Sequence, residues 1–141
     1  MQDRFKFRGK RLDNGQWYYG SYLYLHNAPQ YKWNGDKTQT KEDVYYIIDE
    51  NDVNYGVDIE TVGQCTGIKD KNKNFVYEGD IVKLFDDIKL NDKDYGIYEI
   101  RFMQEFCGFC LYSKNFVSDF GGLHPTDIEV IGNKYENPEL Y

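Results

Sequence analysis

The sequence predicts a mostly β protein, and three observations lead to that class. Aromatic residues make up 18% of the 141 residues, with 14 Tyr and 9 Phe, and such side chains favour the pleated surface of a sheet. Alanine, the strongest helix former, occurs only at Ala28. Runs of about five to eight residues rich in aromatic and β-branched side chains lie between Gly, Asn and Asp, which is typical of short strands joined by turns.

A β-hairpin is expected over residues 4–25. Its first arm alternates charged and aromatic residues, so Phe5 and Phe7 should face a core while their neighbours face solvent. Asn14 and Gly15 supply a turn, because both residues tolerate the positive φ of tight hairpins. In the second arm, Gly20 indicates a bulge or a close backbone approach.

The rest of the chain continues as short strands and polar connections. Residues 26–43 lack any period and are expected to form a loop, and one helical turn is expected near Ile59. Further strands are expected at residues 44–48, 61–68, 75–85, 95–102, 106–112 and 127–131, followed by a polar tail. This spacing predicts a small barrel or sandwich.

Charge and length exclude several classes of protein. Asp and Glu outnumber Lys and Arg by 24 to 17, giving a net charge of -7, and such a chain repels phosphate backbones. No run approaches the roughly 18 consecutive apolar residues that span a bilayer, and the charged N-terminus lacks the apolar stretch of a secretory signal. Three cysteines, an odd number, favour free thiols. We therefore expect a cytoplasmic protein without a membrane partner.

No set of residues in the sequence suits catalysis or metal binding. Cys107 and Cys110 have the spacing of metal ligands, but a zinc site needs two more, and only Cys65, His26 and His124 remain. A Cys65–His124 pair has no local motif to support it. We expect no enzyme, no metal, no cofactor and no small-molecule substrate, with Cys107 and Cys110 as small apolar residues in a hairpin arm.

The N-terminal region suggests a binding surface. Residues 1–11 hold five basic side chains against Asp3, a charge of +4, which leaves -11 for the rest of the -7 total. Aromatic residues of the kind enriched at protein interfaces follow at once. The candidate interaction surface comprises Arg4, Lys6, Arg8, Lys10, Trp17, Tyr19 and Tyr22. It predicts contact with another copy or with a host or phage protein; the alternatives are a nucleic-acid-binding module using the basic strand, and an ordinary solvated edge strand.

A central stretch of the sequence resembles the signature of the YopX family. It runs from Thr61 to Asn72 (TVGQCTGIKDKN) and continues as VYEGDIV from Val76 to Val82. Shorter similarities lie near both ends, in FRGK and WYYG and in VIGN and ENPEL. The matching residues, which turn chemistry explains without a ligand, include Gly63, Gln64, Thr66, Gly67, Lys69, Asp70, Asn72, Tyr77, Glu78, Gly79 and Asp80.

The resemblance implies a phage- or prophage-encoded protein of the bacterial cytoplasm, β-rich, with an SH3-like barrel component and no assigned activity. We accordingly expect an N-terminal hairpin region over 1–60, packed against an SH3-like barrel over 61–131, and a tail over 132–141.

Turn chemistry gives specific expectations within this stretch. Asp70 should accept hydrogen bonds from backbone amides two residues on, and Gly79 should hold a positive φ. The family's turn glycine falls at Lys73 here, so we expect Asn72 or Asn74 to take the left-handed position.

Overall fold

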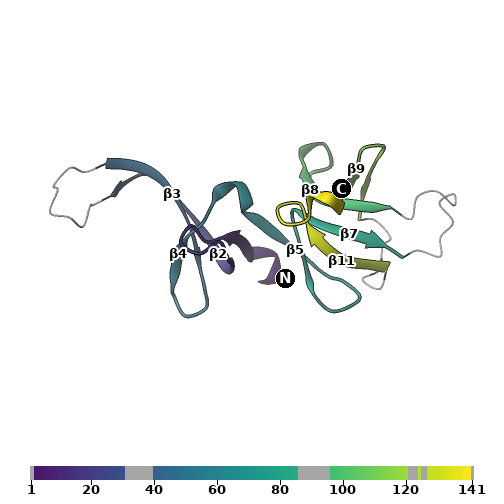
Figure 1. The fold of residues 1–141 in the computed structure, drawn as a ribbon, viewed down its shortest axis with the longest axis horizontal. Helices are drawn as coiled ribbons and strands as arrows, with labels where there is room; N and C mark the ends of the chain where they lie inside the picture. Colours follow the sequence, from purple (N-terminus) through teal and green to yellow (C-terminus); the bar gives the residue numbers. More distant parts are fainter. Residues whose placement is uncertain (1, 31–39, 86–95, 121–123, 125–126, 141) are drawn as a thin grey trace. The chain divides into compact units, whose positions relative to one another are not determined.

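The computed structural model describes residues 2–30, 40–85, 96–120, 124 and 127–140. The predicted class is confirmed, because these residues form antiparallel strands and short 3-10 helices without an α-helix (Figure 1). Within the described part of the chain, no helix has the length and hydropathy to cross a membrane. By its contacts the chain divides into two units, one of Lys6–Val62 and one of Met1–Phe5 with Gly63–Tyr141.

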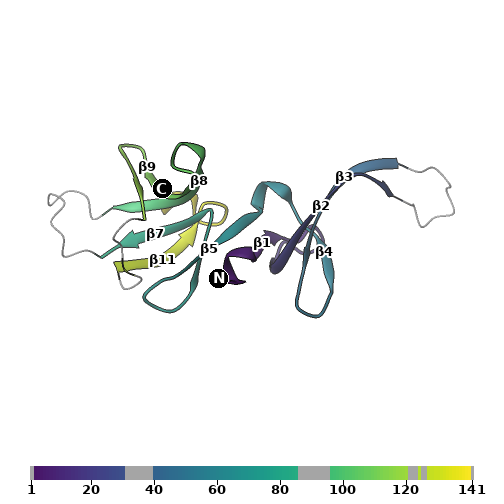
Figure 2. The same ribbon diagram turned by 180° about the vertical axis from the view of Figure 1, so that it is seen from behind.

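The Lys6–Val62 unit is an antiparallel sheet in the strand order β4-β3-β2-β1. Its elements are β1 (Phe7–Lys10), β2 (Trp17–Gln30), β3 (Thr40–Ile48), β4 (Asn54–Gly56) and the 3-10 helix η2 (Ile59–Thr61). β1 covers only the start of β2, and β4 covers only the end of β3. Beyond them β2 and β3 run on together as a two-stranded ribbon, which both views show (Figures 1 and 2).

The turn of the first hairpin forms as expected, but the first arm is shorter than the expected one. Gly15 holds a φ of 69° in the turn, and Gly20 lies where a Cβ atom would come within 1.9 Å of the Ile48 carbonyl oxygen, a close approach. The first arm is shorter than expected: residues 2–5 form a 3-10 helix, η1 (Gln2–Phe5), and Phe5 is 64% exposed rather than in a core. Only Phe7 turns its ring toward another aromatic, Tyr22, at 5.4 Å between centroids.

The loop expected over residues 26–43 is wrong at both ends. β2 continues to Gln30 and β3 begins at Thr40, while residues 31–39 lie outside the described part. A bulge between Leu25 and Ala28, with Asn27 at a φ of 51°, breaks the sequence period that would have indicated a strand. β4 falls in a stretch of turn residues and was not expected either, whereas the helical turn near Ile59 is confirmed as η2.

The second unit contains η1 and the remaining strands. A hairpin of β5 (Gly63–Lys69) and β6 (Phe75–Tyr77) is followed by a five-stranded antiparallel sheet in the order β10-β9-β8-β7-β11 among the described residues. Its members are β7 (Asp80–Leu84), β8 (Ile97–Met103), β9 (Gly108–Ser113), β10 (Phe116–Asp119) and β11 (Ile128–Asn133), with the 3-10 helices η3 (Gln104–Phe106) and η5 (Pro138–Leu140). This sheet is open, with β10 and β11 as its edges, so the closed SH3-like barrel is not confirmed.

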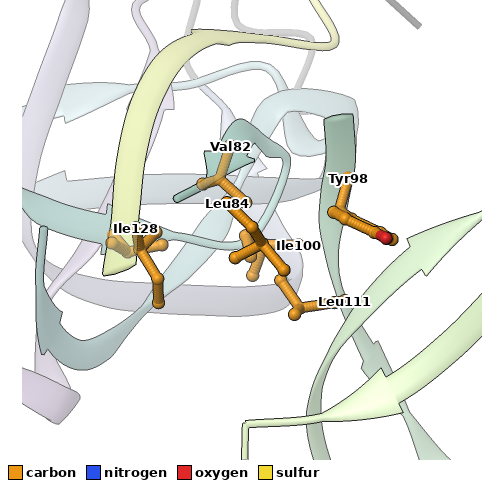
Figure 3. Close-up of a cluster of buried hydrophobic side chains, with 7 residues drawn as sticks. Val82, Leu84, Tyr98, Ile100, Leu111 and Ile128 are labelled. Atoms are coloured by element: carbon orange, nitrogen blue, oxygen red, sulfur yellow. The ribbon is translucent and has the colours of Figure 1, made fainter. Parts of the chain in front are cut away.

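The main hydrophobic cluster of this unit lies on one face of the five-stranded sheet (Figure 3). Residues two apart on a strand share a face, so Val82 and Leu84 of β7 join Tyr98 and Ile100 of β8. The complete cluster is Val76, Val82, Leu84, Tyr98, Ile100, Leu111 and Ile128. Burying each such side chain contributes about 1.5–3 kcal/mol relative to leaving it exposed.

Candidate interaction surface

The seven residues of the predicted interaction surface do not share one face. Arg4 lies in η1 and belongs to the other unit, and Lys6 precedes β1. Arg8 is buried, with its guanidinium carbon 4.6 Å from the Trp17 ring centroid, and the Lys10 ammonium lies 5.5 Å from that ring. The basic side chains of β1 are therefore partly committed to aromatic contacts inside the unit rather than presented as a solvated stripe.

Strand register divides the Lys6–Val62 sheet into two faces. Lys10 pairs with Trp17, Leu23 with Tyr46 and Tyr24 with Tyr45, and paired residues point to the same side. We call one side the tyrosine face; its members are Phe7, Tyr18, Tyr22, Tyr24, Tyr45, Ile47 and Tyr55. The opposite side is the leucine face, formed by Trp17, Tyr19, Leu23, Leu25, Val44 and Tyr46.

The tyrosine face packs on itself. Tyr18 meets Tyr55 edge to face at 4.8 Å, and Tyr24 stacks on Tyr45 at 5.1 Å between ring centroids. The Arg11 guanidinium lies 3.5 Å from the Tyr55 ring centroid and donates from Nε to Asp13 Oδ1 at 2.8 Å. These contacts give the rings and their polar neighbours partners within the unit.

One phenol on this face has a strongly altered pKa. The Tyr18 hydroxyl donates a hydrogen bond to Asp49, which stabilises the protonated phenol and raises its pKa to about 12. The same bond lowers the pKa of the Asp49 carboxyl from its usual value. Asp49 also accepts from the backbone amides of Asn51 and Val53, so it holds the turn between β3 and β4.

A second carboxylate organises the bulge in the β2–β3 ribbon. Asp43 accepts hydrogen bonds from the Asn27 amide at 3.0 Å, the Tyr24 hydroxyl at 3.1 Å and, at 2.9 Å, His26 Nδ1. The backbone bond from Asn27 is the main cause of the lowered pKa of the Asp43 carboxyl. The sequence did not indicate this cluster because His26, Asn27 and Asp43 lie in the stretch that was expected to be a loop.

The leucine face leaves large apolar side chains in contact with solvent. Tyr19 is 48% exposed, Leu23 38% and Leu25 41%, all on the same side of β2. Val44 and Tyr46 lie opposite them on β3 and are half-buried. An extended apolar strip of this kind is a candidate contact surface.

The family-like stretch instead builds the second unit. The buried Asp70 carboxylate accepts from the Asn72 amide at 2.9 Å, as expected, and also from the Asn74 amide at 2.9 Å and the Val130 amide at 3.0 Å. The Lys71 amide donates to the Ile128 carbonyl at 2.9 Å. This turn thereby occupies outward-facing backbone groups of the edge strand β11. Lys73 itself, with a φ of 65°, takes the left-handed position that was expected at Asn72 or Asn74.

Gly79 divides the strand expected over residues 75–85 into β6 and β7. Its φ of 86° confirms the expected positive value, and a Cβ atom there would lie 3.0 Å from Tyr135 Cε2. The buried Asp80 carboxylate accepts from the Tyr77 amide at 2.7 Å across this bend.

The remaining residues of the family-like stretch make contacts within the same unit. Gln64 Nε2 donates to the Arg4 carbonyl at 2.7 Å and the Glu78 amide to the Gln64 carbonyl at 3.0 Å. The Thr66 hydroxyl donates to the Val76 carbonyl at 2.8 Å. Gly63 and Gly67 lie in β5, and the Lys69 ammonium lies 4.7 Å from the Phe75 ring centroid.

Buried charge appears at a place that the sequence did not indicate. The Glu99 carboxylate, almost fully buried in β8, forms ion pairs with Arg101 at 2.7 Å and Lys134 at 3.2 Å. Arg101 in turn lies 3.6 Å from the Tyr112 ring centroid. Glu99 alternates with the core residues Tyr98 and Ile100 along β8, so it lies on the opposite face of the sheet, where the two cations pair with its carboxylate.

The cysteines and histidines do not gather into a site. Cys107 is exposed, in a left-handed conformation after η3 and outside any strand, whereas Cys110 is buried in β9 and Cys65 in β5. His26 joins the Asp43 cluster, and His124 is exposed. Among the described residues, no three or more His, Cys, Asp or Glu side chains are grouped so that they could hold a metal ion.

Comparison with known proteins identifies a family that the sequence matches and a solved structure with a similar fold. The sequence matches the family profile described as YopX protein over residues 6–141. Among solved structures it is similar to the crystal structure of protein yopX from Bacillus subtilis, with 25% identity, a TM-score of 0.53, and 98% of each chain covered. A comparison with curated proteins finds no match.

Proposed function

This chain belongs to the YopX family, and on that premise we propose that it is a non-enzymatic accessory protein that works through protein–protein contacts. In this proposal it is encoded by a phage or prophage, acts in the cytoplasm of the bacterial host, and self-associates through the Lys6–Val62 unit. Nucleic acid, membranes, cofactors and small-molecule substrates have no part in it.

The observation that carries the proposal is the thin core of the Lys6–Val62 unit. Within the described residues, the buried hydrophobic side chains of this unit are Ile47 and Val57 alone. A stable domain places a second layer against the apolar face of a sheet. The aromatic and aliphatic side chains along β2 and β3 therefore favour a layer supplied by another polypeptide.

Sedimentation velocity of the full chain tests self-association. The monomer has a mass of 16.7 kDa, and we expect a dimer or a larger species at micromolar concentration. Because apolar contact should dominate, raising the salt to about 1 M should weaken the assembly only modestly. A single 16.7 kDa species at high micromolar concentration would contradict the proposal and leave a host or phage protein as the partner.

The alternative is a nucleic-acid-binding module based on the first strand. Arg8 and Lys10 in β1 favour this alternative, but Arg8 is buried and contacts the Trp17 ring, and the chain is acidic overall. Titration of a single-stranded oligonucleotide at several salt concentrations distinguishes the two functions. Binding whose affinity falls steeply with salt would support the alternative, since phosphate contacts release counterions.

A further inference from the structure

We propose that the leucine face packs against the same face of a second copy of this chain, so that the sheets of two copies pack face to face. The inference rests on the proposed self-association, and it adds which surface is used, in what orientation, and which residue lies at its centre.

The two faces of the sheet differ in how far they are already occupied. On the tyrosine face, ring contacts join Tyr18 to Tyr55 and Tyr24 to Tyr45, and Arg11 covers Tyr55. On the leucine face, Leu23 and Leu25 remain exposed in the middle of the longest strand. Tyr19, Leu23 and Leu25 are exposed on the leucine face against Tyr24, 45% exposed, on the tyrosine face, so covering the leucine face removes more apolar surface from water.

Contacts within the chain stabilise the β2–β3 ribbon, which carries the leucine face, without a partner. An isolated two-stranded hairpin is marginally stable in water. Here the Asp43 carboxylate ties the bulge to Tyr24, His26 and the Asn27 amide, and Tyr24 stacks on Tyr45. All of these groups lie on the tyrosine side or at the bulge, so they hold the ribbon in shape without covering Leu23 and Leu25. A surface ordered in advance loses less entropy on binding.

The area of the face suits a second copy. β2 has 14 residues, and a strand of that length runs about 45 Å. With two to four strands side by side, at about 4.8 Å spacing plus side chains, the face covers roughly 500–600 Å². Two copies would then bury at most roughly 1,000–1,200 Å² in total, which is the lower limit of a specific interface. A two-fold pair uses the same patch on both subunits and so covers both incomplete sheets at once.

The charges at the two ends of the face set the orientation. Lys10 lies opposite Trp17 at one end, and Glu42 lies opposite Ala28 at the other. A two-fold arrangement with antiparallel β2 strands places the Glu42 end of one copy over the Lys10 end of its partner. Leu23 lies close to midway between Trp17 and Ala28, so the two-fold axis passes near Leu23.

Leu23→Glu tests the centre of this interface. Two carboxylates would meet across the axis, so we expect the dissociation constant of the dimer to rise at least about tenfold, as for a central residue of an interface. Leu12→Glu is the matched control, because Leu12 is 72% exposed in the same unit and lies outside the leucine face. It should change the dissociation constant by less than about threefold. Equal effects of the two variants, both folded by circular dichroism, would overturn the proposal.

Hydroxyl-radical footprinting of the wild-type chain gives a test that needs no variant. Between dilute and concentrated protein, we expect protection of Leu23 and Leu25 and none of Tyr24, their neighbour on the opposite face. Protection of Tyr24 without Leu23, in a chain that does dimerise, would refute the leucine face and leave self-association standing. A chain that stays monomeric at high concentration would refute both.

Cross-linking tests the orientation. In a Cys107→Ser background, which removes the exposed thiol, Leu23→Cys should be joined to its own copy by a short bismaleimide, and Leu12→Cys should not. Efficient dimer formation by both variants, or by neither, would contradict a two-fold axis near Leu23.

Discussion

The unit of Met1–Phe5 with Gly63–Tyr141 and the Lys6–Val62 unit are both built of antiparallel strands, yet they bury them to very different extents. Of the thirteen buried hydrophobic residues in the described structure, eleven lie in the former unit. There, Asp70 and Lys71 also engage the free edge of β11. In the Lys6–Val62 unit, the β2–β3 ribbon extends beyond β1 and β4 with apolar side chains exposed. The family-like stretch therefore belongs to the unit with the larger hydrophobic core, and the Lys6–Val62 unit leaves more of its apolar side chains exposed.

The largest effect should come from the core itself. Ile100→Ala removes a fully buried side chain and should lower the free energy of unfolding by about 2–5 kcal/mol. Leu23→Ala, on the exposed strip of the other unit, should cost under about 1 kcal/mol when measured on monomer. Urea denaturation at low protein concentration makes the measurement. Similar losses in the free energy of unfolding at both positions would contradict the difference in burial between the two units.

Substitution of Asp70 should have the second-largest effect on stability. The buried Asp70 carboxylate accepts from three backbone amides, so Asp70→Ala leaves three part-buried donors without this acceptor and should lower the free energy of unfolding by about 2–3 kcal/mol. Hydrogen exchange at the Val130 amide should speed up in the same variant. As a control, Asp13→Ala removes a carboxylate from an exposed turn and should change stability by less than about 0.5 kcal/mol.

Gly79→Val tests the bend between β6 and β7. The left-handed backbone and the nearby Tyr135 ring both oppose a branched side chain, so we expect a loss of about 1–3 kcal/mol. The denaturation midpoint should fall with an unchanged slope. A midpoint equal to that of the wild type would mean that this glycine has no conformational role.

Lys73→Gly should have a smaller and opposite effect. Lys73 holds a φ of 65°, which costs a residue with a Cβ atom more than it costs glycine. We expect the free energy of unfolding to rise by about 0.5–1 kcal/mol. This value allows for the greater conformational entropy that glycine gives the unfolded chain. Thermal denaturation of both proteins provides the check, and a lower melting temperature for the variant would count against strain at this turn.

The smallest effect concerns acid stability in the Lys6–Val62 unit. The pKa of Asp49 is lowered in the folded chain, so the unfolded chain binds more protons and the carboxylate stabilises the fold above its unfolded pKa of about 3.9. That contribution is lost as the pH falls through the folded pKa. Between pH of about 5 and about 3, the urea midpoint of wild type should therefore fall more than that of Asp49→Asn. Parallel curves would show that the Tyr18–Asp49 hydrogen bond does not stabilise the folded state.

Local turn chemistry was readable in the sequence because it depends on a few adjacent residues. The positive φ of Gly15 and Gly79 and the capping by Asp70 follow from backbone sterics and short side-chain reach. The β class followed from composition, since aromatic residues in short runs suit pleated surfaces. The family-like stretch was recognisable for the same reason: its glycines, Asp70 and Asp80 meet local geometric needs.

The tertiary structure determines the features that depend on contacts between residues far apart in the sequence. β2 extends to Gln30 because β3 pairs with it and Asp43 ties down the bulge, which no local period records. Arg8 contacts the Trp17 ring because the register of β1 on β2 puts both side chains on one face, and the buried Glu99 pairs with Lys134 and Arg101. The turns and the β class could be predicted from the sequence because they depend on neighbouring residues and on composition. Strand pairing and ion pairing join residues that are distant in the sequence, so the tertiary structure determines which surfaces are left exposed.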